Sequence, residues 1–380
     1  MKRGKPDFWL ILLAFLLLGF GLVMVFSASY FNGYTDPDIN DSYYYFKKQL
    51  LFALIGLFLF FFVSNIPYYK YRKWAVPILL ICLILLILVP MIGLVRNGAQ
   101  RWLGIGALSF QPSELVKIGM IIYIAYIMEK KQPLLDQFRR GLLPPLIVLG
   151  AVSILLMLQP HFSAVVIILG TCFTIIFCAG ARLKHLFLIA LSGLPVLIVV
   201  MLLGDYRVDR IVSLLNPLSD PTGSGYQIMQ SLMAIGPGGL TGVGLGKSIQ
   251  KLAYLPEAHT DFIFSILSEE LGFIGGVTLI ILFVLLIVRG ILIAVQAPNQ
   301  FGTLLATGIV TLIAIESIFN LGVVTALLPV TGVPLPLISY GGTALVFKLI
   351  SLGILLNISR YRNVKRKGHR SSSNIQPVQL

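Results

Sequence analysis

Charged residues are scarce in this sequence. Of its 380 residues only 12% are Asp, Glu, Lys or Arg, whereas 57% are hydrophobic. A soluble domain carries roughly a quarter of its residues as charges, so this composition excludes an ordinary soluble protein. Cysteine is also rare. Cys82, Cys172 and Cys178 all lie in apolar segments, which excludes a disulfide framework and a zinc-binding spacing.

The sequence contains many long apolar runs. A membrane-spanning helix needs about 20 mostly apolar residues. The sequence therefore predicts an all-α polytopic membrane protein with about ten transmembrane helices. The predicted spans are 8–30, 48–66, 75–95, 113–129, 142–159, 162–180, 184–203, 262–288, 302–328 and 338–358. The first run is too long for a signal peptide and lacks a small-residue cleavage site, so we interpret it as a retained span.

The basic residues predict the orientation. The net charge is +14, and its concentration in short loops and the C-terminal tail is a topology signal that argues against nucleic-acid binding. The side bearing more Lys and Arg also holds both ends of the chain, so we expect a multi-pass protein of the cytoplasmic membrane with both termini cytoplasmic. Residues 1–362 are then one transmembrane domain, and 363–380 form a basic, then disordered tail.

A large extracytoplasmic loop, 204–261, precedes the eighth span. It is rich in Gly, Pro, Asn and Asp, and it holds apolar pieces such as YQIMQSLMAIG, which we expect to form short helices on the outer face. Its glycine-rich part, 236–248, resembles a phosphate-binding P-loop, but Thr241 stands where that motif needs glycine. Close approach to a ligand and simple loop flexibility remain about equally favoured there.

The stretch LPEAHTDFIFSILSEELG, 255–272, concentrates carboxylates at the mouth of the eighth span. Pro256 followed by Glu257 is typical of a helix start. If the helix runs through the stretch, Asp261 and Glu269 share one face, with Glu269 about 12 Å deeper. Asp261 then lies at the outer interface, within reach of a substrate.

Glu269 and Glu270 are expected inside the bundle, where a structural or supporting role is favoured over catalysis. His259 and Asp261 form an H-x-D pair, but two ligands without a third make a weak metal signal. A loop histidine is the preferred interpretation, and the identity of any metal stays open.

Other charges are best explained by pairing. Glu114 and Lys117 are three residues apart at the start of a span and predict an ion pair. Glu316 and Lys348 lie in neighbouring late spans and predict a cross-helix pair.

Cations and an aromatic residue also lie beside the outer surface. Arg101 and Trp102 make a phosphate-binding interpretation available, although Trp102 could equally be an interfacial anchor. Arg207 and Arg210 could pair with nearby Asp residues, with a lipid headgroup or with a pyrophosphate.

Several long motifs, in order, resemble the SEDS family (shape, elongation, division and sporulation), the FtsW, RodA and SpoVE group. The resemblance covers nearly all of residues 8–362 and is closer to the FtsW and SpoVE branches. The motifs are NGAQRWLGIG, FQPSELVK, GSGYQIMQSLMAIGPGGLTGVGLGKS, LPEAHTDFIFSILSEELGFIGG and PVTGVPLPLISYGG.

The resemblance implies a peptidoglycan glycosyltransferase that polymerises lipid II, the undecaprenyl-pyrophosphate-linked disaccharide-peptide. It implies a class B penicillin-binding protein and other divisome or elongasome membrane proteins as partners. It makes Asp261 the catalytic carboxylate, Trp102 functionally important, and Arg207 and Arg210 candidates for the pyrophosphate. His161 stands where many members have an acid, and Lys348 replaces a commonly apolar residue; both depart from the pattern.

The chemistry of such a transfer needs one base for the acceptor hydroxyl, since pyrophosphate already leaves well. We therefore expect Asp261 to act as general base in an inverting transfer, with Arg101, Arg207, Arg210, Trp102, Glu257 and His259 binding substrate. The sequence requires no cofactor, although a divalent cation (Mg²⁺ or Mn²⁺) could assist. The alternatives are a flippase for lipid-linked precursors and a non-catalytic scaffold for a penicillin-binding protein.

Overall fold

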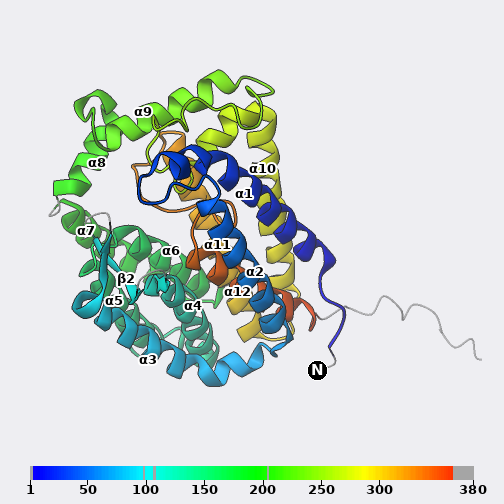
Figure 1. The fold of residues 1–380 in the computed structure, drawn as a ribbon. Coiled ribbons are helices and arrows are strands. Elements are labelled where there is room, and N and C mark those ends of the chain that lie inside the picture. The colour runs from blue at the N-terminus through cyan, green and yellow to red at the C-terminus, as the bar shows by residue number, and fades with distance from the viewer. Residues whose placement is uncertain (1–2, 97–98, 106–107, 203–204, 363–380) are drawn as a thin grey trace, which may run out of the picture.

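The computed structural model describes residues 3–96, 99–105, 108–202 and 205–362, and these are mainly helical (Figure 1). The basic tail predicted for 363–380 lies outside this range. Each of the ten predicted spans overlaps one long helix. These helices are α1 (Phe8–Thr35), α2 (Tyr44–Asn65), α3 (Tyr69–Ile92), α4 (Pro112–Lys130), α5 (Leu143–Met157), α6 (Phe162–Cys178), α7 (Leu183–Leu202), α10 (Ile263–Val295), α11 (Gln300–Val324) and α12 (Thr343–Ser359).

Six of the helical segments in the described residues are long and apolar enough to cross a membrane: Phe8–Thr35, Tyr44–Asn65, Tyr69–Ile92, Phe138–Met157, Ile263–Val295 and Gln300–Val324. Large apolar side chains such as Phe58 and Met91 point outward on them, as lipid-facing residues do. The chain is thus a multi-pass membrane protein. Helix α4 carries four charged residues, α6 and α12 are 17 residues long, and α7 is not among these six. The full count of ten therefore stays a prediction.

The turn between α5 and α6 forms where Pro160 predicts it. Helix α5 ends at Met157, and α6 begins at Phe162. The Nδ1 atom of His161 accepts a hydrogen bond from the backbone N–H of Ala164 at 3.2 Å. His161 therefore caps the N-terminus of α6, in place of the Ser or Asp side chains that more often do so.

A small antiparallel sheet connects α3 to α4. Its strands are β1 (Leu94–Arg96), β2 (Ala99–Ile105) and β3 (Leu108–Phe110), in the order β1-β2-β3. Most of this segment lies between the predicted spans 75–95 and 113–129, where no strands were predicted. Because Arg101 and Trp102 lie on β2, the sheet fixes the positions of both side chains.

Short helices cover one end of the bundle, as predicted for loop 204–261 (Figure 1). They are α8 (Asp205–Leu215), η3 (Pro217–Ser219), α9 (Ser224–Ile235) and η4 (Gly236–Gly238). The segment YQIMQSLMAIG lies mostly in α9. The remaining short helices are η1 (Gln132–Leu134) and the π-helix η2 (Phe138–Leu142), both between α4 and α5.

The eighth span was predicted to begin at residue 262, close to the observed start of α10, but the helix start predicted at Pro256 and Glu257 is wrong. Helix α10 begins at Ile263, and Glu257 adopts the left-handed conformation with φ of 54°. The physical reason is tertiary: Tyr340 donates its N–H to the carbonyl of His259 at 2.9 Å, and Asn320 donates to the carbonyl of Asp261 at 2.7 Å. These carbonyls would otherwise accept intrahelical bonds. Asp261 therefore sits in a turn, and its predicted helical face and depth relative to Glu269 do not apply.

Helix α10 is broken at Gly272, where φ is 66° and ψ is −161°. The glycine-rich loop 236–248 fills the break and satisfies the exposed backbone groups. The bonds run from Val243 N to Glu269 O (3.0 Å), Gly244 N to Glu270 O (3.0 Å), Phe273 N to Gly239 O (2.8 Å) and Ile274 N to Leu240 O (3.1 Å). Since unpaired backbone groups are costly in a membrane, this loop is a structural part of α10.

Glycine is required where the two backbones meet. A Cβ on Gly242 would lie 2.1 Å from the carbonyl oxygen of Glu270, and one on Gly272 would lie 2.3 Å from the nitrogen of Gly242. Both residues also have positive φ, which side chains disfavour. Close approach is therefore the reason for these glycines, and the approached group is the protein's own backbone.

The two ends of the described chain meet on one side. Gly4 donates its N–H to the carbonyl of Arg360 at 2.7 Å. The buried Asp7 caps α1 and accepts ion pairs from Arg289 at 2.6 Å and Arg362 at 2.9 Å. A chain whose ends lie on the same side crosses its bundle an even number of times, in agreement with the predicted topology.

Candidate active site

Asp261 lies in the turn before α10, against the loop that joins α11 to α12. The side-chain amide of Asn320 holds this arrangement, because it donates to the carbonyls of both Asp261 and Val333, at 2.7 and 2.8 Å. Gly332 faces the carboxylate: a Cβ there would lie 3.6 Å from Oδ2 of Asp261. The carboxylate thus sits beside a glycine that leaves space next to it.

The surroundings of Asp261 raise the pKa of its carboxyl, which favours its action as a base. The pKa of this carboxyl is raised from 3.8 to about 7, mainly by burial and also by the negative charge of Glu257, while Arg210 acts in the opposite direction. Arg210 comes from α8 and donates to the carbonyl of Val330 at 2.7 Å. A carboxylate with a pKa near the working pH can accept a proton and release it again.

Glu257 is exposed beside Asp261. Its carboxylate accepts a hydrogen bond from the Thr260 hydroxyl at 2.6 Å, which orients it within the turn. The structure brings Glu257, Asp261 and Arg210 into electrostatic contact. Contact of Glu257 with substrate stays a prediction.

His259 is buried beside two tyrosines. Its ring centroid lies 4.5 Å from that of Tyr45 and 5.5 Å from that of Tyr340. Burial lowers the pKa of His259, so the ring is neutral. Sequence reasoning missed both tyrosines. Tyr340 could have been found from its place in PVTGVPLPLISYGG, but Tyr45 approaches only through the fold.

Arg101 reaches the α5–α6 turn. Its guanidinium donates to the carbonyl of Gln159 at 3.2 Å and to that of Pro160. The same turn leads to Ser163, whose hydroxyl donates to the carbonyl of Thr331 at 2.6 Å. Arg101 is thereby connected to the loop beside Asp261, and phosphate binding by it remains a prediction.

The other two predicted binding residues are less closely defined. Trp102 is half-buried on β2, opposite Leu94 in the sheet. Arg207 belongs to α8, but its side chain lies outside the described part of the chain. Their predicted roles in binding stay predictions.

His161 replaces an expected acid without supplying a charge. Its ring lies 2.8 Å from the side-chain amide of Gln111, and burial, together with the nearby Arg101, lowers its pKa to about 3. Because Nδ1 accepts from the backbone, the ring proton is on Nε2, and the Gln111 amide must then present its oxygen to that nitrogen. This neutral ring caps α6 and stabilises the turn whose carbonyls accept hydrogen bonds from Arg101.

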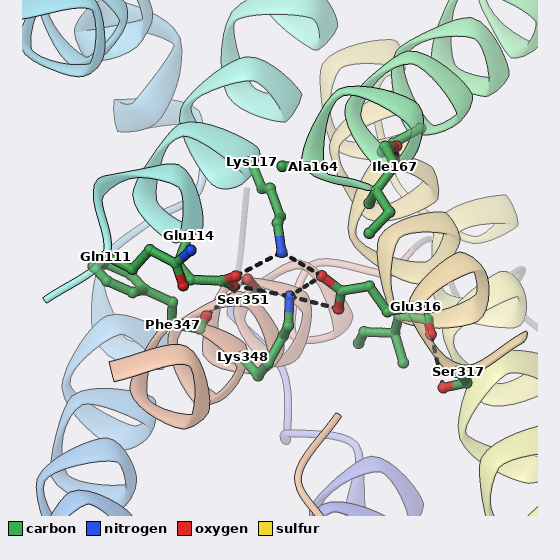
Figure 2. Close-up of polar contacts among 12 residues, drawn as sticks. Gln111, Glu114, Lys117, Ala164, Ile167, Glu316, Ser317, Phe347, Lys348 and Ser351 are labelled. Atoms are coloured by element: carbon green, nitrogen blue, oxygen red, sulfur yellow. Dashed lines mark hydrogen bonds and ion pairs between the residues drawn. The ribbon is translucent and has the colours of Figure 1, made fainter. Parts of the chain in front are cut away.

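The two predicted ion pairs merge into one buried cluster, shown in Figure 2. Lys117 lies 2.6 Å from Glu114 and 2.7 Å from Glu316, and Lys348 lies 2.6 Å from Glu316 and 3.5 Å from Glu114. The cluster links α4, α11 and α12. Lys348 now has a clear role, since it supplies the second positive charge that balances two buried carboxylates.

Glu269 and Glu270 bind the end of the glycine-rich loop. Glu269 accepts from the hydroxyl of Ser248 and from the N–H of Ile249 at 2.9 Å. Glu270 accepts from Lys251 at 2.7 Å and from the hydroxyl of Ser27. These contacts are those of supporting residues, which is the role expected for this pair.

No group of three or more His, Cys, Asp or Glu side chains is placed to hold a metal ion in the described residues. The site as described consists of a carboxylate of raised pKa, a second carboxylate, a cation and an aromatic wall. Such a site can remove a proton from a hydroxyl beside a negatively charged leaving group.

Sequence comparisons match this chain to known proteins along nearly its whole length. The profile of the FtsW, RodA and SpoVE family, described as cell cycle protein, matches residues 8–364. Stage V sporulation protein E of Bacillus subtilis (strain 168) is 48% identical over 362 residues, which cover 95% of this chain and 98% of that protein. The probable peptidoglycan glycosyltransferase FtsW of Geobacter sp. (strain M18) is 42% identical, with 94% and 98% covered.

Solved structures share the fold. A chain from the structure described as "Structural coordination of polymerization and crosslinking by a peptidoglycan synthase complex" has a TM-score of 0.78 at 29% identity and covers 95% of this chain and 99% of its own. The rod shape determining protein RodA of Thermus thermophilus has a TM-score of 0.70 at 30% identity, with 94% and 98% covered.

Proposed function

This chain belongs to the FtsW, RodA and SpoVE family of cell cycle proteins, and we propose that it is a peptidoglycan glycosyltransferase in which Asp261 is the general base. A relative that is 42% identical over almost its full length carries the name probable peptidoglycan glycosyltransferase FtsW. Its substrate is lipid II, from which it makes glycan strands. The observation that carries the assignment of the base is the position of the Asp261 carboxylate, which lies beside Gly332 in the turn held by Asn320, where its surroundings raise its pKa to about 7.

The proposed reaction uses the two sides of the site differently. The Asp261 carboxylate takes the proton of the acceptor sugar hydroxyl while that oxygen attacks the anomeric carbon of the donor. The bond from this carbon to the pyrophosphate oxygen breaks, and the electron pair leaves with the undecaprenyl pyrophosphate. Attack opposite to the departing group inverts the anomeric carbon. Asp261 then gives its proton to water.

Arg210 is suited to the leaving group. It stands beside Asp261, on α8, and a guanidinium binds phosphate oxygens through paired donors. Arg207 lies one helical turn away on the same helix and is the second proposed cation. Both act by stabilising the negative charge that develops as the pyrophosphate departs.

The proposed setting follows from the topology. Helices α8 and α9, which belong to the same predicted loop as Asp261, lie at the end of the bundle away from the N-terminus (Figure 1). With the termini in the cytoplasm, Asp261 faces the outside of the cytoplasmic membrane. One solved relative belongs to a peptidoglycan synthase complex, which supports a class B penicillin-binding protein as the partner that cross-links the product.

The test is polymerisation of lipid II by the purified protein in detergent, with and without a class B penicillin-binding protein, read as glycan chains on a gel. We expect Asp261→Ala to make no polymer while melting at a temperature close to that of the wild type. Asp38→Ala is the matched control, because Asp38 is an exposed carboxylate between α1 and α2. Polymer formation by folded Asp261→Ala at the wild-type rate would disprove the assignment. A flippase or scaffold would make no polymer even as wild type.

A further inference from the structure

Three rings form a corner beside the catalytic turn. Tyr45 from α2 and Tyr340 from the loop before α12 stand edge to face, with centroids 5.3 Å apart and planes at 89°. The ring of His259 lies 4.5 Å from Tyr45 and 5.5 Å from Tyr340. The two tyrosine rings therefore pack edge to face, and the ring of His259 lies against both.

The corner adjoins the carboxylates. Glu257 interacts electrostatically with Asp261, with His259 and with the hydroxyl of Tyr45. Its charge therefore acts on both the base and the ring corner. Arg210 also acts on Asp261, whereas the three rings carry no charge. The site thus has a cationic part suited to a phosphate and an uncharged aromatic part with a different chemistry.

The backbone fixes the corner as firmly as it fixes the base. Tyr340 donates its N–H to the carbonyl of His259 at 2.9 Å. Gln49, one turn after Tyr45 on α2, donates its side-chain amide to the carbonyl of Ser339 at 3.1 Å. The rings and Asp261 therefore belong to one rigid assembly, as preorganised binding requires.

Two observations point to a ligand in addition to internal packing. Tyr45 and Tyr340 are only half-buried, so part of each residue remains exposed. His259 is 91% buried, and its Nδ1 has no hydrogen-bond partner among the described residues. A buried nitrogen without a partner costs free energy, and a rotation of the ring that brings Nδ1 to a hydroxyl or amide of a ligand would remove that cost.

We propose that Tyr45, His259 and Tyr340 form a carbohydrate subsite that stacks one pyranose ring of the glycan strand beside Asp261. A sugar ring presents an apolar C–H face to an aromatic ring and hydroxyl or acetamido groups at its rim, which matches an uncharged corner with an unpaired nitrogen. The proposal rests on the proposed function, because it takes the acceptor to be a glycan. It assigns to the rings the task of placing the acceptor hydroxyl at the base.

The test compares Tyr45→Leu, which removes the ring and keeps an apolar side chain, with Tyr45→Phe, which keeps the ring. Tyr34→Leu is the matched control, because Tyr34 is 65% exposed at the end of α1. Polymerisation kinetics are measured against lipid II concentration. Binding of a soluble, lipid-free tetrasaccharide of the same glycan to the purified protein is measured by ligand-observed NMR, and melting temperatures are recorded.

A ring-to-sugar contact predicts about a fivefold rise in KM and a matching loss of tetrasaccharide affinity for Tyr45→Leu. The kcat value changes little, Tyr45→Phe restores KM, and Tyr34→Leu behaves as the wild type. Unchanged KM and unchanged tetrasaccharide binding in Tyr45→Leu would overturn the subsite while leaving the polymerase intact. A lower melting temperature and lower kcat with normal tetrasaccharide binding would also overturn it, in favour of packing alone.

Failure of the proposed function is a separate result. A wild-type protein that makes no polymer refutes the polymerase. If this protein still binds the tetrasaccharide, and Tyr45→Leu does not, the corner is a sugar site in a protein of another activity.

Discussion

The pH profile of glycan polymerisation should move in opposite directions when the two charges beside Asp261 are removed. The pKa of Asp261 is about 7, so the fraction of ionised base rises from roughly a tenth at pH 6 to roughly nine-tenths at pH 8. The wild-type kcat/KM should follow this curve. Glu257 raises the pKa and Arg210 lowers it, which makes each a separate control on the midpoint.

Glu257→Gln keeps the shape that Thr260 binds and removes the charge. We expect the midpoint of kcat/KM to fall by roughly half a pH unit. Arg210→Met should raise it by a similar amount, and Arg210→Lys, which keeps the charge, should leave it near 7. The midpoint is read instead of the rate, because both residues are also proposed to contact substrate.

Protein stability gives an independent measurement of the same carboxyl. The folded state raises the pKa of Asp261 above its ordinary value of 3.8, so the stabilisation from the bound proton is complete below about pH 4 and is lost as the pH rises toward 7. Asp261→Asn should melt near the wild-type temperature at pH 4 and above it at pH 8. The loss of unfolding free energy between these two pH values is at most about 4 kcal/mol. The partial exposure of Asp261 reduces it. A wild-type midpoint near 4, or midpoints that shift in the same direction, would refute the reasoning.

Two further predictions concern the framework of the site. Lys348→Met leaves two buried carboxylates with one cation and should cost about 3–5 kcal/mol of unfolding free energy. In detergent melts, the double variant Lys348→Met with Glu316→Gln should recover most of this loss. Equal losses in the single and double variants would argue against charge balance. Gly272→Ala should lower the melting temperature strongly, because its Cβ meets the backbone of Gly242 at 2.3 Å at positive φ. Gly19→Ala, with open space around it, should have little effect, and a tolerant Gly272 would show that the break in α10 can relax.

Some contacts around the site could be predicted from the sequence. Glu114 and Lys117 lie three apart at a helix start, which suffices to predict their pair. Helix spacing failed for Asp261, because donors from Asn320 and Tyr340 take the carbonyls that a helix would use. Residues as distant in sequence as these can compete with local propensity only once the chain is folded, so no local pattern could reveal the turn.

The sequence by itself determined the class of protein, the positions of ten long helices and the identity of the candidate base, because apolar runs and contiguous motifs are properties of residue order. Tertiary structure alone decided what surrounds that base. It merged two separate ion pairs into one cluster across α4, α11 and α12, fitted the glycine-rich loop into α10, and set Tyr45 against His259. Each of these depends on distances between residues remote in sequence, which packing of the helices fixes.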